Sequence, residues 1–185
     1  MMQPDQFNTL YPYLLVIVPE EPLASSLLAI KKTIEKFIDQ TVFQQPHITV
    51  FPMFYWCDKQ EYLLVHHIKN ILPHLYSFEV NIKGIACNQD KKQLFMPTDS
   101  NNLFDACHIH FKDYFSFHAS EHQLSMNDIN GQLILANGDL KKNALVKAWN
   151  KIKHVDFEGS FYANKIALLK RDLTGWNVIK HFHLD

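Results

Sequence analysis

The chain has 185 residues, of which 47% are hydrophobic and 13% aromatic, and its formal net charge is −1. This composition indicates an ordered globular protein with a substantial core, and it excludes both a disordered chain and a surface that coats nucleic acid throughout. No apolar run reaches the roughly 18 residues that a membrane span needs. Three widely spaced cysteines predict free thiols, so we expect a cytoplasmic protein without a membrane partner.

Hydrophobic periodicity predicts alternating strands and helices in the first half. Tyr13–Val18 is an apolar, β-prone strand that ends at Pro19, and apolar steps of three and four predict a helix over 22–39. The next strand carries His47 and Thr49. A helix over 59–72 follows, with Asp58 and Glu61 as a predicted capping box.

The second half repeats this order loosely. Residues 78–82 alternate as a half-exposed strand does, and 93–96 is predicted to be its hairpin partner across a turn at 88–90. The remaining predicted elements are helices over 101–116 and 141–153 and strands over 132–136, 157–170 and 176–183. We therefore predict a single α+β domain over 1–185, with two pseudo-symmetric lobes, largely antiparallel sheets flanking a central cleft, and helices outside.

The charge along the chain is uneven. Residues 141–180 hold nine basic and three acidic residues, which leaves +6 there and −7 elsewhere. A local phosphate-attracting face would explain this excess, but lysines on solvated helix faces are the interpretation preferred from sequence.

The stretch Pro46-His47-Ile48-Thr49-Val50-Phe51 carries the most informative pattern. Because residues alternate sides along a strand, the His47 imidazole and the Thr49 hydroxyl point the same way. An imidazole can move a proton and a hydroxyl can hold a phosphate oxygen. In the second predicted lobe, Gln132 and Ile134 occupy the equivalent i, i+2 positions, and neither side chain can transfer a proton.

His47-Ile48-Thr49, 85 residues ahead of Gln132-Leu133-Ile134, resembles the paired His-x-Thr/Ser motifs of the two-histidine (2H) phosphoesterase superfamily. That superfamily includes 2′-5′ RNA ligase-like proteins and cyclic phosphodiesterases. The resemblance extends along most of the chain, from the strand ending at Pro19 to the late segments 161–168 and 176–184. The second motif is degenerate, and the usual basic residue after each motif is absent.

The resemblance implies that His47 acts as a general acid or base and that Thr49 holds a phosphate oxygen. The expected partner is a nucleotide or RNA end with a cyclic phosphate or a 2′-5′ linkage, not DNA, and neither metal nor cofactor is expected. Gln132 and Ile134 mark the degenerate second motif, where Gln132 retains hydrogen bonding only. We therefore expect impaired metal-independent acid–base chemistry, or alternatively an inactive relative that binds such an end; a protein-interaction scaffold is a third option.

Other interpretations of the eleven histidines remain open. His47 can also be a core histidine whose hydrogen bonds are satisfied by the backbone. His181 and His183 share one face of the last predicted strand and could approach the site, whereas His118 and His122 have a helical i, i+4 zinc spacing without further ligands.

Overall fold

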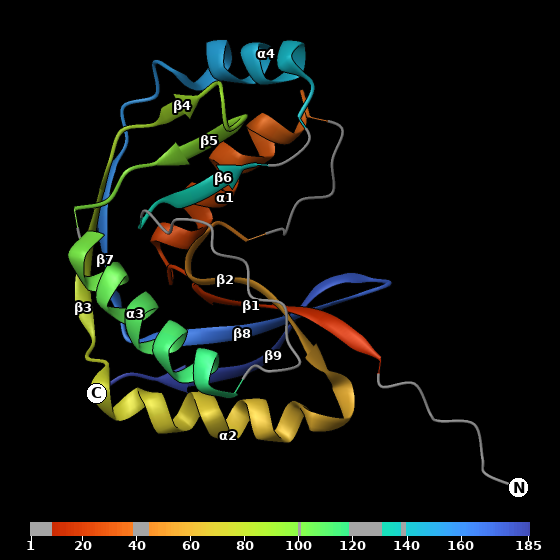
Figure 1. Cartoon of the computed structure of the whole chain (residues 1–185). Coiled ribbons are helices and arrows are strands. Elements are labelled where there is room, and N and C mark those ends of the chain that lie inside the picture. Colours follow the sequence, from red (N-terminus) through yellow and green to blue (C-terminus); the bar gives the residue numbers. More distant parts are fainter. Residues whose placement is uncertain (1–8, 39–44, 100, 119–130, 138–139) are drawn as a thin grey trace, which may run out of the picture.

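The computed structural model describes residues 9–38, 45–99, 101–118, 131–137 and 140–185. These residues form nine strands and four α-helices, close to the predicted positions (Figure 1). No described helix has both the length and the apolar character needed to cross a membrane. The strands are β1 (Leu10–Ile17), β2 (His47–Cys57), β3 (Phe78–Lys83), β4 (Ala86–Asn88), β5 (Gln93–Met96), β6 (Leu133–Ala136), β7 (Glu158–Ala163), β8 (Lys165–Asp172) and β9 (Gly175–His183). The helices are α1 (Leu23–Glu35), α2 (Glu61–Ile71), α3 (Asn101–His118) and α4 (Lys142–Ile152), with short 3-10 turns at Asp58–Gln60 and Leu72–His74.

Two antiparallel sheets organise the described chain. Seven strands form one sheet in the order β4-β5-β6-β2-β1-β8-β9, and β3 pairs with β7 in the other. Figure 1 shows α1 and α4 beside β4, β5 and β6 at one end, and α2 and α3 at the other end. Within these groups α1 packs against α4 and α2 packs against α3. The α+β prediction with two lobes and largely antiparallel pairing is confirmed.

The predicted hairpin between residues 78–82 and 93–96 is wrong. β3 pairs with β7, whereas β5 pairs with β4 on one side and β6 on the other. The predicted turn at 88–90 is confirmed in position, but it closes β4 onto β5 through the four residues 89–92. Short connections of this length favour a hairpin between adjacent strands, and the pattern of the sequence does not reveal so short a strand as β4.

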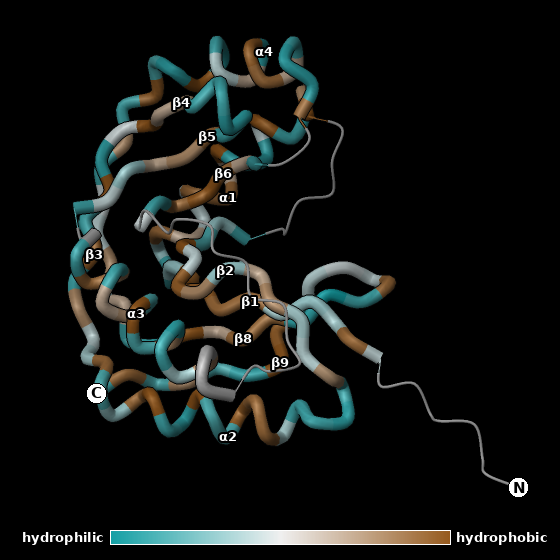
Figure 2. The backbone as a smooth tube through the Cα atoms, in the orientation of Figure 1, coloured by the Kyte–Doolittle hydropathy of each residue, from teal (hydrophilic) through white to brown (hydrophobic). Residues whose placement is uncertain are grey.

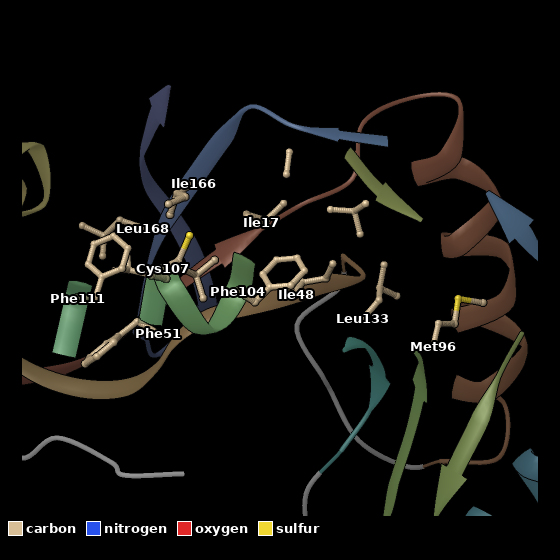
Figure 3. Close-up of a cluster of buried hydrophobic side chains, with 14 of the residues drawn as sticks. Ile17, Ile48, Phe51, Met96, Phe104, Cys107, Phe111, Leu133, Ile166 and Leu168 are labelled. Carbon is tan, nitrogen blue, oxygen red and sulfur yellow. The ribbon is translucent and has the colours of Figure 1, made fainter. Parts of the chain in front are cut away.

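The main core lies between the large sheet and the helices. In Figure 3, side chains from β2, β6 and β8 converge with those of α3. Phe51 contacts Phe111 and Phe115, with ring centroids 6.2 Å and 5.3 Å apart. The tube in Figure 2 is accordingly hydrophobic along much of β1 and β8. Three large aromatic residues of β1 and β2 are also buried in this core: Tyr13, Phe54 and Trp56.

The carboxylates of Asp58 and Glu61 hold a lysine and do not cap α2. The helix has Gln60 at its N-cap, without a capping side-chain bond, so the predicted capping box is wrong. Both carboxylates contact Lys170 on β8, the Glu61 Oε2 at 3.0 Å from Nζ, and Tyr13 donates to the same oxygen at 2.8 Å. Burial and this bond to Glu61 raise the pKa of Tyr13. The cluster fastens the start of α2 to the sheet.

We expect Tyr13→Phe to lower the free energy of unfolding by about 1–2 kcal/mol, because the substitution removes one hydrogen bond to a carboxylate and leaves the ring packing intact. Urea unfolding of the purified variant measures the change. Tyr11→Phe removes the same hydroxyl two residues earlier on β1 and is the matched control. Equal losses in the two variants would refute a specific role for the Tyr13–Glu61 bond.

Candidate functional site

The two motif segments meet as neighbouring strands of the large sheet. β2 and β6 pair antiparallel, with His47 opposite Ile134 and Ile48 opposite Leu133. Continuing this register by one residue places Thr49 beside Gln132, which directly precedes β6. The sequence predicted the two motifs in separate lobes that flank a cleft, whereas the structure pairs the two motif strands edge to edge in one sheet.

This register sets all four motif positions on one face of the sheet, because directly paired residues share a face and alternate residues do too. Ile48 and Leu133 point to the other face, where both are fully buried in the main core. The arrangement is twofold: the histidine position of each motif lies beside the hydroxyl position of the other. In this chain the two pairs are His47 with Ile134, and Thr49 with Gln132.

The two pairs differ in exposure. His47 and Ile134 are 6% and 8% exposed, whereas Thr49 and Gln132 are both half-buried. A ligand that approaches this face therefore meets the Thr49 hydroxyl and the Gln132 amide before it reaches the imidazole. Both groups can donate to a phosphate oxygen.

The His47 ring is oriented by the backbone. Its Nδ1 lies 3.1 Å from the Gln45 carbonyl oxygen. A carbonyl only accepts, so Nδ1 carries the proton in this bond and Nε2 is the acceptor nitrogen of the neutral ring. The hydrogen bond to the backbone therefore selects the tautomer of His47 in which Nε2 is the basic nitrogen. Such a bond is compatible with both interpretations of His47, as a core histidine and as a catalytic one.

Burial lowers the pKa of His47 to about 4; the bond to Gln45 raises it and the nearby charge of Lys31 lowers it further. Desolvation is the largest cause of the lowered pKa, because the ring is almost completely removed from water. At pH 7 the imidazole is neutral. It can accept a proton, but it has none to supply as a general acid.

Sequence reasoning missed two buried polar residues around the motif strands. Lys31 on α1 is 1% exposed, and burial lowers its pKa to about 8 while the charge of Glu35 raises it. Thr98 donates its hydroxyl to the carbonyl of Gly131, immediately before Gln132. A signal for Lys31 was present, since it follows Leu27 by four residues on the apolar face of α1.

His181 lies on the same sheet face as the motifs but distant from them. The pairings Thr49–Val16, Val16–Ala167 and Ala167–His181 form one row across four strands. Three strand spacings separate Thr49 from His181, about 14 Å. Proton transfer requires hydrogen-bond reach, so His181 does not replace the missing second histidine. His183 lies two residues further along β9 on the same face.

Two other histidines make contacts between the helices and the large sheet or between two helices. His108 stacks on Phe51, and His67 lies with Nδ1 3.2 Å from the Tyr114 hydroxyl. His122 lies outside the described residues, as does the side chain of His118, so the structure does not describe that pair. Within the described part of the chain, no group of three or more His, Cys, Asp or Glu side chains is placed to hold a metal ion.

No family model and no curated protein matches the sequence. The fold, however, is similar to solved structures over nearly its whole length. LigT of E. coli, complexed with 3′-AMP, is 9% identical with a TM-score of 0.60, covering 95% of this chain and 99% of LigT. TT0787 of Thermus thermophilus is 13% identical with a TM-score of 0.64, covering 94% of this chain and 97% of TT0787.

A third solved structure, a phosphoesterase, is 10% identical with a TM-score of 0.58, covering 94% of this chain and 98% of its own. Similarity at this level of identity concerns the fold, and function is argued from the site. The chain therefore has the same fold as LigT and this phosphoesterase, which confirms the fold that the resemblance in its sequence implies.

Proposed function

We propose that this chain binds a nucleotide or RNA end that carries a 2′,3′-cyclic phosphate or a 2′-5′ linkage, and that it opens the phosphodiester slowly. The observation that carries the proposal is the strand register, which sets His47, Thr49 and Gln132 on one face. Solved LigT structures contain 3′-AMP, ATP and NADP+, which makes nucleotides the ligand class to test.

The proposed reaction has a general base but no general acid. His47 Nε2 takes a proton from a water molecule as the water oxygen attacks phosphorus, and the bond from phosphorus to one ribose oxygen breaks. Thr49 and Gln132 donate to the non-bridging oxygens. The leaving oxygen takes its proton from solvent, because an amide cannot transfer one. A missing general acid costs about 10²–10⁴ in rate, or roughly 3–5 kcal/mol of barrier.

A second candidate is binding without turnover. The lowered pKa of His47 favours it, since a weakly basic imidazole draws a proton from water less readily. In this case the same face holds the phosphate through neutral donors, and the nucleotide end is retained unchanged.

We expect the purified protein to open a nucleoside 2′,3′-cyclic phosphate in the presence of a chelator, and His47→Ala to abolish this turnover. Chromatographic product analysis measures the rate, and His66→Ala, an exposed histidine on α2, is the matched control. Absent turnover with His47-dependent nucleotide binding would favour the second candidate. Absence of both would reject a nucleotide site on this face.

A further inference from the structure

A lysine face lies on the outer side of α4. Residues 141–153 contain five lysines and no acidic residue. All five lysines are exposed. We call this set the α4 lysine face: Lys141, Lys142, Lys147, Lys151 and Lys153.

The opposite side of α4 packs in the hydrophobic core. Leu145, Ala148 and Ile152 are 0–1% exposed, and Trp149 is half-buried against the same core. Figure 1 shows α4 at one extremity of the molecule, outside β4 and β5. Packing therefore fixes which side of the helix faces outward, and that side presents lysines with Asn143 and Asn150 between them.

Elements next to α4 extend the positive charge. The helix packs against α1 and β5. The turn before β5 exposes Lys91 and Lys92 beside Asp90. The end of α1 likewise exposes Lys32 and Lys36 near Glu35. These neighbours add four positive and two negative charges, so they do not neutralise the α4 lysine face.

The helix dipole acts in the same direction. Lys141 is the N-cap of α4 and Lys142 its first residue, and the first turn contains no acidic residue. The N-terminus of a helix already carries a partial positive charge, so lysines there are electrostatically unfavourable for the isolated helix. They concentrate positive potential at the end of α4 that follows β6.

We propose that the α4 lysine face binds the sugar–phosphate backbone of an RNA whose 3′ end occupies the His47–Thr49 face. The identification of the nucleic acid as RNA rests on the proposed function, since a 2′,3′-cyclic phosphate requires a ribose. Lys141 follows Ile134 by seven residues, and seven fully extended residues span about 25 Å. The backbones of these two residues can therefore be no farther apart than this distance. Because the motif face and the α4 lysine face lie on opposite sides of the main core, the RNA strand must also pass around the edge of the sheet, and it must be longer than this direct distance.

The chemistry of the face favours RNA over an anionic membrane. A membrane-surface helix inserts large apolar side chains beside its lysines. The outward side of α4 offers only Val146, 38% exposed, because Leu145, Ala148 and Ile152 are buried and Trp149 packs half-buried against the core. Lysine and asparagine side chains suit phosphate and sugar contacts, which do not read base sequence. The face therefore supplies sequence-independent affinity.

The test compares two charge-matched triple variants of the full chain. Lys142→Gln, Lys147→Gln and Lys151→Gln together remove three charges from the α4 lysine face. Lys59→Gln, Lys69→Gln and Lys180→Gln remove three exposed charges elsewhere. One probe is a fluorescent single-stranded RNA of about 12 nucleotides that ends in a 2′,3′-cyclic phosphate. This length exceeds the longest backbone separation given above. The other probe is the corresponding mononucleotide. Anisotropy titrations at several salt concentrations measure affinity and its salt dependence.

We expect the α4 triple variant to bind the RNA at least tenfold more weakly at low salt, with mononucleotide affinity unchanged. Three lost phosphate contacts at about 0.7 each should reduce the slope of log affinity against log salt by about 2. Equal weakening in both triple variants would overturn the proposal. Unchanged RNA binding in the α4 triple variant would also overturn it. If this variant instead lost binding to phosphatidylserine vesicles, the α4 lysine face would be a membrane-binding surface and the proposal would be wrong.

The two proposals fail separately. If His47→Ala leaves both the turnover and the binding of the mononucleotide unchanged, the proposed function fails, whereas an α4-dependent salt slope for RNA still supports the lysine face. If the mononucleotide binds through His47 and the RNA binds no more tightly than the mononucleotide, the lysine face fails and the proposed function stands. Loss of mononucleotide affinity in the α4 triple variant would also overturn the inference, because the lysines would then act on the site itself.

Discussion

Gln132→His combined with Ile134→Thr should raise the rate of cyclic phosphodiester opening by about 10²-fold. The substitutions place an imidazole beside Thr49 and a hydroxyl beside His47, completing the twofold arrangement that the strand register already provides. A positioned general acid contributes about 10²–10⁴-fold, and we expect the lower value because the neighbouring residues are not adjusted to the two new side chains. Steady-state hydrolysis of a nucleoside 2′,3′-cyclic phosphate measures the gain.

The pH profile separates a restored acid from a general improvement in binding. With two imidazoles in opposite roles the rate should become bell-shaped in pH, whereas the natural chain should show only the limb that requires neutral His47. Adding His47→Ala to the double variant should remove the gain. Ile134→Thr alone is the control for loosened packing, since Ile134 is only 8% exposed. An unchanged rate in a folded double variant would refute the pairing of the motifs in one active site.

His47 should make the protein less stable as the pH falls from about 7 to 4. Burial lowers the pKa of the folded imidazole to about 4, below the value of about 6.5 in the unfolded chain. Between these values the unfolded state binds the proton and the folded state does not, so stability falls as the pH falls. The full difference is about 3 kcal/mol, lost by the time the pH reaches the folded pKa.

Urea unfolding between about pH 4 and 7 measures this contribution as a difference between variants, because carboxylates also titrate in that range. His47→Gln removes the titrating group and keeps a polar side chain, so its stability should depend less on pH than that of the natural chain. His66→Gln makes the same substitution at an exposed histidine of α2 and is the matched control. Parallel curves for all three proteins would contradict the burial of a neutral His47.

Local periodicity was sufficient for most elements of the fold. The positions of α1, α2, α3 and α4 follow from apolar steps of three and four, and β1 follows from its apolar run. Pairing partners were harder to predict. β3 alternates as a hairpin strand does, but its partner β7 lies about 80 residues away, and no local pattern specifies such a contact.

Ion pairs between distant segments were also not predictable from local sequence patterns. Asp58 and Glu61 have the spacing of a capping box, but Lys170 competes for both carboxylates from a strand more than 100 residues later. A lysine that satisfies two carboxylates outweighs a local cap worth about 1 kcal/mol. The basic segment after residue 140 was visible in the sequence, but only the packing of α4 showed that its lysines share one outward side.

The sequence by itself determined which side chains the two motif segments carry: one His-x-Thr pair is intact, and Gln132 stands at the histidine position of the second. It also determined the α+β class, because strand and helix periodicities are local properties of the chain. Only the tertiary structure decided that the motifs lie edge to edge, that His47 is neutral at pH 7, and that Lys31 lies near it. Register and desolvation arise from contacts between distant segments, and the pattern within each segment does not contain them.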